Sequence, residues 1–157
     1  ISKSNVTFFS KAPLENIEAS NKDSKGIIVA GSMTFLFKIP IKSFHFPSSL
    51  MEEHFNENYL ESEKYPYATY KGKIEKDFDL SKDGVYLVDA VGDLTMHGVT
   101  KSAQFPSVIT VKNGKPTIQS KFIVKLKDYN ITIPSVVFNK IAEQVEVSID
   151  AAFDSIK

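Results

Sequence analysis

The chain has 157 residues, equal numbers of acidic and basic side chains and no cysteine. This length fits one domain with one hydrophobic core over residues 1–157, and the missing cysteines exclude disulfides, thiolate metal sites and a cysteine nucleophile. No basic patch of the kind that binds nucleic acid is present, and no apolar run approaches the length of a membrane-spanning helix.

Alternation of apolar and polar residues is the dominant pattern from the N-terminus onward. Val6 and Phe8 share one parity in a first short run, and Ile17 and Ala19 share one in a second. A third, longer run from Val29 to Ile41 places its odd-numbered apolar residues on one face. A period of two is that of a β-strand with one buried face, so the sequence predicts three strands.

An amphipathic helix is predicted after the third strand. Ser49 and Glu52 have the spacing of a capping box, and Pro66 prevents a helix from continuing past residue 65. The apolar residues that recur at helical spacing on one face are Met51, Phe55 and Tyr59. The sequence therefore places a helix between strands three and four.

Two dipeptides after this helix predict tight turns between strands. His97-Gly98 and Asn113-Gly114 each lie between alternating apolar runs, and Asn-Gly is the strongest short-range signal for a β-hairpin. Ser135 to Ala142 are expected to form a short helix or turn before the last strand. The strands expected after the helix cover residues 68–75, 85–96, 103–111, 118–127 and 145–153.

Eight mostly antiparallel strands form either a two-sheet sandwich or a closed barrel. Twelve Phe and six Tyr are spread over the strands and the helix, mixed with small residues of the same inward parity. This mixture favours a barrel with room along its axis. The opposite face carries Lys, Thr, Glu and Gln, whereas a membrane barrel needs an apolar outer face.

The stretch from Gly92 to Lys101 resembles the signature of the YceI-like family of bacterial lipid-binding proteins. Tyr59–Pro66 is similar to the helix-to-strand passage of that family, and Asp128–Ile131 is similar to the segment after its seventh strand. The resemblance implies an all-β, eight-stranded lipocalin-like barrel that encloses a polyisoprenoid or similar long-chain lipid. It implies neither a cofactor nor catalysis.

One position departs from the pattern of the family. Many relatives carry an arginine shortly before the Asp-Tyr pair, whereas this chain has Leu126 with inward parity. An inward arginine binds a phosphate or polar head group, and leucine does not. Asn130 in place of the usual glycine is a milder change, because Asn tolerates the left-handed backbone region.

The candidate ligand-binding residues are the inward aromatic and aliphatic side chains of this barrel. Burying a dozen carbons of a prenyl or acyl tail contributes on the order of 10 kcal/mol before the costs of binding. Each candidate is equally interpretable as an ordinary core residue. The predicted lining is Phe35, Phe37, Tyr70, Leu94, Phe105, Phe122, Leu126 and Ile149 from strands, with Phe55 and Tyr59 from the helix.

The three histidines do not indicate a metal site or an enzyme. His45 and His54 lack the spacing of a zinc helix, and His97 is interpreted as a turn residue whose ring bonds to nearby backbone. No nucleophile elbow, paired carboxylates or phosphate-binding loop is present. The alternative function is a non-enzymatic protein-interaction or stress-response module with a solid core, whose partner meets the lysine-rich strand faces.

The cellular location of the protein is expected from the resemblance and from the first residue of the chain, whereas its oligomeric state is not. A chain that begins at Ile1 is compatible with a cleaved export signal, so a periplasmic or secreted location is expected, with a cytoplasmic one left open. A homodimer is compatible with the sequence.

Overall fold

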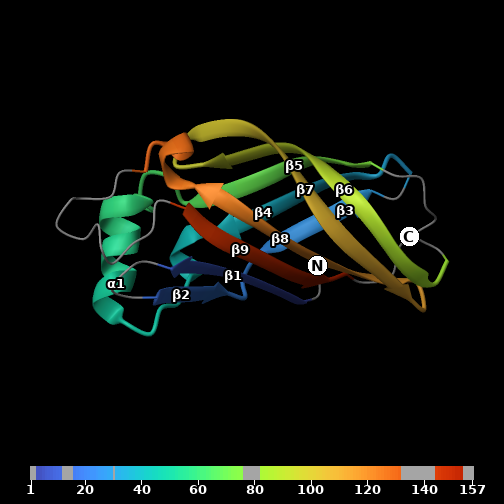
Figure 1. Cartoon of the computed structure of the whole chain (residues 1–157), viewed down its shortest axis with the longest axis horizontal. Coiled ribbons are helices and arrows are strands. Elements are labelled where there is room, and N and C mark those ends of the chain that lie inside the picture. The colour runs from blue at the N-terminus through green and yellow to red at the C-terminus, as the bar shows by residue number, and fades with distance from the viewer. Residues whose placement is uncertain (1–2, 12–15, 30, 76–81, 132–143, 154–157) are drawn as a thin grey trace.

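The computed structural model describes residues 3–11, 16–29, 31–75, 82–131 and 144–153. Within these ranges the chain forms one antiparallel sheet of nine strands in the order β2-β1-β9-β8-β7-β6-β5-β4-β3, curled into a half-barrel (Figure 1). The strands are β1 (Lys3–Lys11), β2 (Asn16–Asn21), β3 (Lys25–Val29), β4 (Thr34–Pro40), β5 (Tyr67–Glu75), β6 (Gly84–Met96), β7 (Val99–Lys112), β8 (Lys115–Lys125) and β9 (Gln144–Ala152).

The prediction of an all-β antiparallel fold is confirmed, but the count of eight strands is wrong. The third predicted strand is two strands, because the chain turns back between β3 and β4 and Met33 adopts a φ of 56°. Val29, expected inward, is 50% exposed. The turn changes which residues face inward, from odd-numbered in β4 to even-numbered in β3. As a result Ile28 rather than Val29 lies opposite the buried Phe35.

The helical region lies between β4 and β5 and closes one end of the half-barrel (Figure 1). It consists of α1 (Ser49–His54) followed directly by a π-helical segment, η2 (Phe55–Tyr59). Its N-cap is Ser48, whose hydroxyl accepts from the Met51 N–H, so the predicted cap at Ser49 is wrong by one residue. The Glu52 carboxylate instead accepts from the Phe46 N–H and holds the preceding loop. The second predicted helix, 135–142, lies outside the described residues.

Short connections join β2 to the end of β4 and the segment after it, at the helical end of the sheet. The 3-10 turn η1 (Ile41–Ser43) follows β4, and His45 then exchanges two backbone hydrogen bonds with Ser20 of β2. The buried Asn21 donates to the Pro40 carbonyl at 2.8 Å, and this bond joins the β2 end to the β4 end. Among the described residues, these contacts connect β2 to the β4 end across the opening of the curled sheet.

Both predicted hairpin turns are confirmed. Met96 pairs with Val99 across His97-Gly98, and Lys112 pairs with Lys115 across the Asn113-Gly114 turn. His97 and Gly98 have φ values of 53° and 74°, the double positive φ of a type I′ turn. The twist of this turn matches the right-handed twist of the strands, so β6 and β7 pair along their whole length.

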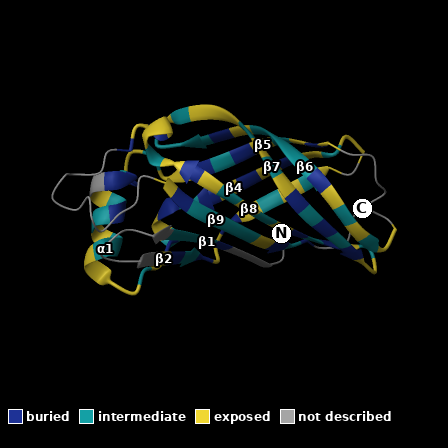
Figure 2. Cartoon of the chain, viewed as in Figure 1, coloured by how far each residue is buried: buried dark blue, intermediate teal, exposed yellow. Residues whose placement is uncertain are grey.

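The inner face of the curled sheet is buried and the outer face is exposed, as the alternation of colours along β4 and β8 shows (Figure 2). Gly72 and Gly92 lie opposite each other in the paired strands β5 and β6. A Cβ on Gly92 would lie 2.2 Å from the Lys71 carbonyl oxygen, and one on Gly72 would lie 2.0 Å from that of Val91. Only glycine permits this approach, which bends the sheet around its core.

Candidate functional site

Two adjoining cavities lie inside the half-barrel. The helix-end cavity has a volume of about 120 Å³. Its lining is apolar apart from one tyrosine hydroxyl and consists of Val6, Phe8, Ile39, Ile41, Phe44, Phe46, Met51, Phe55, Tyr59, Leu60, Ala68, Leu94, Met96, Phe122, Val124, Leu126, Ile131, Val145 and Val147.

The second, inner cavity has a volume of about 50 Å³ and lies farther along the sheet. It shares Ile39, Leu94 and Phe122 with the helix-end cavity, so the two meet at these side chains. Its remaining lining is Phe35, Phe37, Tyr70, Ile74, Val88, Ala90, Phe105, Ser107, Ile109, Ile118, Ser120 and Ile149.

All ten predicted ligand-binding residues line these cavities, although their contact with a ligand stays a prediction. Phe55, Tyr59 and Leu126 line the helix-end cavity, and Leu94 and Phe122 line both. The five that line the inner cavity alone are Phe35, Phe37, Tyr70, Phe105 and Ile149. A larger groove of about 780 Å³, lined by both exposed and buried residues, contains one of the ten, Ile149, and shares Val88, Ser107, Ser120 and Ile149 with the inner cavity.

Sequence reasoning missed an aromatic cluster at the helical end. The ring of Phe8 lies 5.2 Å from that of Phe44, 5.5 Å from Phe46 and 5.4 Å from Phe55. Phe44 and Phe46 follow the turn η1, where the inward parity changes from odd to even, so alternation carried on from β4 does not find them. The cluster forms the wall of the helix-end cavity on the side of β1 and α1.

A row of aromatic rings lines the inner cavity, and one of them, Phe122, also lines the helix-end cavity. Phe105 of β7 and Phe122 of β8 stack with 3.7 Å between ring centroids. Tyr70 packs against Phe105 at 5.1 Å and against Phe35 at 5.0 Å. The ladder between β7 and β8 ends at Ser107–Ser120, so the stacked pair lies where these strands diverge. Both rings are half-buried, so they are less tightly enclosed than the core residues around them.

Tyr70 brings a buried phenol into this row. Its single proton is shared between the carbonyl oxygens of Ala90 and Ala103, at 2.9 and 2.8 Å. Burial, reinforced by the negative charge of Asp93 and by Tyr129, raises the pKa of Tyr70 to about 12. Burial also raises the pKa of Tyr59, whose ring lines the helix-end cavity.

The raised pKa of Tyr70 predicts a loss of stability at alkaline pH. In the unfolded chain a tyrosine ionises near pH 10, so stability is complete below pH 10 and falls as pH rises towards about 12. Tyr70→Phe removes this proton and is expected to lower stability by about 1 kcal/mol at pH 7 but to flatten the alkaline decline. Urea unfolding at a series of pH values measures both effects, and parallel declines in the two proteins would contradict the assignment.

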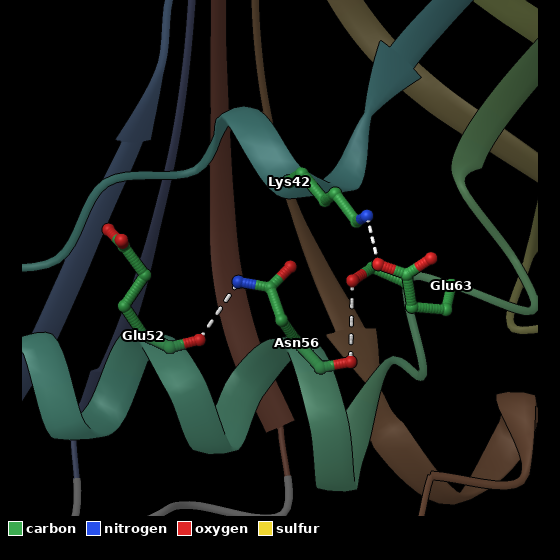
Figure 3. A network of polar contacts seen from close by, with 5 residues as sticks. Lys42, Glu52, Asn56 and Glu63 are labelled. Atoms are coloured by element: carbon green, nitrogen blue, oxygen red, sulfur yellow. Dashed lines mark hydrogen bonds and ion pairs between the residues drawn. The ribbon is translucent and has the colours of Figure 1, made fainter.

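Polar contacts hold the helical region in place beside the helix-end cavity. The polar surface that they form, from Lys42, Glu52, Asn56, Ser62 and Glu63, is called the rim of this cavity. The Asn56 side-chain amide donates to the Glu52 carbonyl at 2.9 Å (Figure 3), and the Asn56 backbone carbonyl also accepts from the Ser62 N–H at 2.8 Å. Lys42 pairs with Glu63 across the rim (Figure 3). Because η2 is wound as a π-helix, with the Leu60 N–H bonded to the Phe55 carbonyl, buried side chains of this segment face the cavity.

His97 forms two hydrogen bonds to residues that lie far from it in the sequence. Its Nδ1 lies 2.9 Å from the Tyr129 carbonyl oxygen, which is a backbone atom but lies 32 residues away rather than nearby as predicted, and its Nε2 lies 2.8 Å from Glu61 Oε1. Glu61 was not predicted, since 36 residues separate it from His97. No cluster of His, Asp or Glu suited to a metal ion occurs in the ranges that the structure describes. Within the same ranges, no helix has the length and apolar character needed to cross a membrane.

Three solved structures share this architecture. BcnA of Burkholderia cenocepacia is 15% identical with a TM-score of 0.81, covering 96% of each chain. A polyisoprenoid-binding domain from Saccharophagus degradans is 17% identical with a TM-score of 0.77, covering 97% of this chain and 94% of the other. The YceI protein of Campylobacter jejuni is 18% identical with a TM-score of 0.71, covering 92% and 88%. At these identities the likeness concerns the fold.

No curated protein sequence matches the chain. The family model of the YceI-like domain matches residues 2–153, which is nearly the whole chain. The stretch from Gly92 to Lys101 lies within this match and forms the β6–β7 hairpin described above. The protein therefore belongs to the YceI-like domain family.

Proposed function

We propose that the protein binds, transports or stores a long-chain lipid, of the polyisoprenoid or a similar amphiphilic class, inside the curled sheet and without catalysis. The observation that carries the proposal is the pair of adjoining cavities, whose shared lining is apolar. A tail in such a cavity is held by removal of methylenes from water, at about 0.8 kcal/mol each. The Saccharophagus degradans neighbour, a polyisoprenoid-binding domain, supports the same class of ligand.

A long tail occupies both cavities only if side chains where the cavities meet, such as Phe122, change rotamer. Volumes of about 120 and 50 Å³ hold part of such a tail. Phe105 and Phe122 are half-buried at the end of the β7–β8 ladder, where rotation meets fewer neighbours than in the closed core. Phe122, which is stacked on Phe105, is therefore the aromatic ring that a tail displaces when it extends from the helix-end cavity to the inner one.

The head group that fits the rim is uncharged. Leu126 lines the helix-end cavity at the position where the resemblance to the family implies an arginine in many relatives. The rim cation Lys42 is paired with Glu63, which neutralises it. A phosphate would lie beside apolar side chains and lose its hydration without a matched partner. A hydroxyl or quinone head group loses less hydration free energy when it is placed beside apolar side chains.

Native mass spectrometry before and after organic extraction tests the proposal. We propose a periplasmic or secreted location, so the full-length protein is recovered from those fractions of the cells that produce it. The expected result is a bound mass that disappears on extraction and corresponds to a long-chain lipid without phosphorus. A phosphorylated ligand would contradict the head-group assignment, and protein recovered without any bound mass that also takes up no added lipid would contradict the function.

The alternative, a protein-interaction module with a solid core, has less support. Cavities interrupt the core, and the lysine-rich outer face of β8 is partly neutralised because Lys121 pairs with Glu146 at 3.2 Å. Lysine on exposed strand faces is also a common protection against edge aggregation.

A further inference from the structure

We propose that the sheet has a side opening between β7 and β8, through which a tail longer than the two cavities continues onto the outer surface of the protein. The proposal rests on the lipid-binding function above and assigns a place to the part of the ligand that the cavities do not hold. The end of the tail lies in the groove of about 780 Å³, called here the outer groove, whose lining comes from β1, β6, β7, β8 and β9.

β7 and β8 pair over only part of their length. Their ladder ends at the pair of Ser107 and Ser120, and both strands continue beyond this pair towards the helical end (Figure 1). Within the ranges that the structure describes, residues 99–106 pair only with β6, and residues 121–125 pair only with β9. The sheet is therefore split between β7 and β8 over this length.

Pro106 explains where the ladder ends. Its carbonyl oxygen accepts from the Ser120 hydroxyl at 3.0 Å, so the backbone polar groups of Pro106 face β8. The next bond of an antiparallel ladder needs a backbone N–H at residue 106, and proline has none. The ladder therefore stops at Ser107 and Ser120, and the two strands separate.

The outer groove and the inner cavity meet at this split. Val88, Ser107, Ser120 and Ile149 line both of them, so the same side chains form the barrier between the two spaces. The two serines are smaller than their inward-facing neighbours along β7 and β8, which are Phe105, Ile109, Ile118 and Phe122. The barrier is therefore thinnest at the serines, beside the stacked phenylalanine rings.

The outer groove contains an apolar strip that suits a hydrocarbon chain. Leu87 of β6 pairs with Val108 of β7, and the Leu87 side chain is 67% exposed. Pro106 adds an exposed ring beside them. A tail that covers this strip removes apolar surface of the tail and of the protein from water. The strip continues the apolar path that begins in the helix-end cavity.

The opening predicts how affinity depends on the length of the ligand. A short prenol such as farnesol is expected to end inside the cavities, whereas a long prenol such as solanesol reaches the outer groove. In a closed pocket the additional isoprene units would find no space, and affinity would fall with length. The wild-type protein is therefore expected to bind solanesol at least as tightly as farnesol.

Leu87→Asp tests the groove, and Val85→Asp is its matched control. The two side chains lie two residues apart on β6 and are 67% and 68% exposed, but only Leu87 lines the groove. Displacement of N-phenyl-1-naphthylamine, an uncharged apolar dye, measures the affinity for each prenol. Leu87→Asp is expected to bind solanesol at least about tenfold more weakly, the factor that two buried methylenes supply, and to bind farnesol as the wild type does. Val85→Asp is expected to bind both prenols as the wild type does.

Pro106→Val tests the split. Valine restores the N–H at residue 106 and favours an extended strand, so the ladder is expected to continue past Ser107 and Ser120 and close the opening. Slow hydrogen exchange of the new amide measures this closure. The variant is expected to lose about tenfold or more in affinity for solanesol and to keep its affinity for farnesol. Gln104→Val is the control, because it places valine at an exposed position of β7 without adding a backbone donor.

The short prenol separates failure of the opening from failure of the binding function. Wild-type affinity for solanesol in Leu87→Asp, or in Pro106→Val with a protected amide, would overturn the opening. If farnesol still binds in that case, the proposed function stands. If neither prenol displaces the dye from the wild-type protein and native mass spectrometry detects neither bound, the proposed function fails.

Discussion

Ala68→Leu is expected to abolish most of the affinity for a long apolar ligand while leaving the protein folded. Ala68 is buried in β5, pairs with Ile39 and lines the helix-end cavity. The three added carbons occupy space that a tail would fill, and loss of three methylenes at about 0.8 kcal/mol each lowers affinity roughly 50-fold. Titration with N-phenyl-1-naphthylamine or a solubilised prenol measures the loss.

The neighbouring position provides the control for added bulk. Thr69 points to the opposite face of β5 and lines neither cavity, so Thr69→Leu is expected to bind as the wild type does. An empty apolar cavity lowers the stability of the fold, and filling it restores part of that stability. The unfolding midpoint of Ala68→Leu is therefore expected to stay level or rise. Unchanged affinity in a folded Ala68→Leu protein would place the ligand outside the helix-end cavity.

Gly92→Ala is expected to destabilise the fold by at least about 3 kcal/mol, the upper part of the range for forced overpacking. The new Cβ would lie 2.2 Å from the Lys71 carbonyl oxygen and 2.7 Å from the Gly72 Cα. Both are backbone atoms of the paired strand β5, so no side-chain rotation relieves the clash. The strands must separate, which removes ladder hydrogen bonds and opens the bend that surrounds the inner cavity.

Gly31→Ala is the matched control for the loss of a glycine. A Cβ at Gly31 meets nothing within 4 Å, so this variant is expected to change stability by less than about 1 kcal/mol. Urea unfolding measures both variants, with the shift read from the midpoint at unchanged slope. Equal stability of Gly92→Ala and the wild type would show that β5 and β6 separate at little cost.

Local patterns in the sequence were sufficient for most of the strands and for the turns. His97-Gly98 and Asn113-Gly114 were predicted as hairpin turns, and both have positive φ at their two central residues. Turn type depends on the two central residues of the turn, and strand parity depends on alternation between neighbouring residues. Both can therefore be predicted from short stretches of sequence. The same parity placed Leu94 and Phe122 at the cavities.

The errors lie where a local pattern had two interpretations. The run from Val29 to Ile41 keeps its apolar residues through the β3–β4 turn, so it resembles one long strand. Ser48 and Ser49 are both acceptable N-caps, and the position of the preceding loop, held by Glu52, selects Ser48. In each case, which of the two local structures forms depends on what the segment packs against in the folded protein.

The amino-acid sequence was sufficient to predict the all-β class, the parity of most strands, the two tight turns and the family. The nine-stranded sheet, its half-barrel shape, the place of Phe44 and Phe46 in the cavity wall and the contact of His97 with Glu61 became visible only in the folded protein. The difference arises from distance along the chain. Alternation and turn chemistry act between neighbouring residues, whereas contacts such as that across 36 residues exist only after the sheet has brought distant segments together.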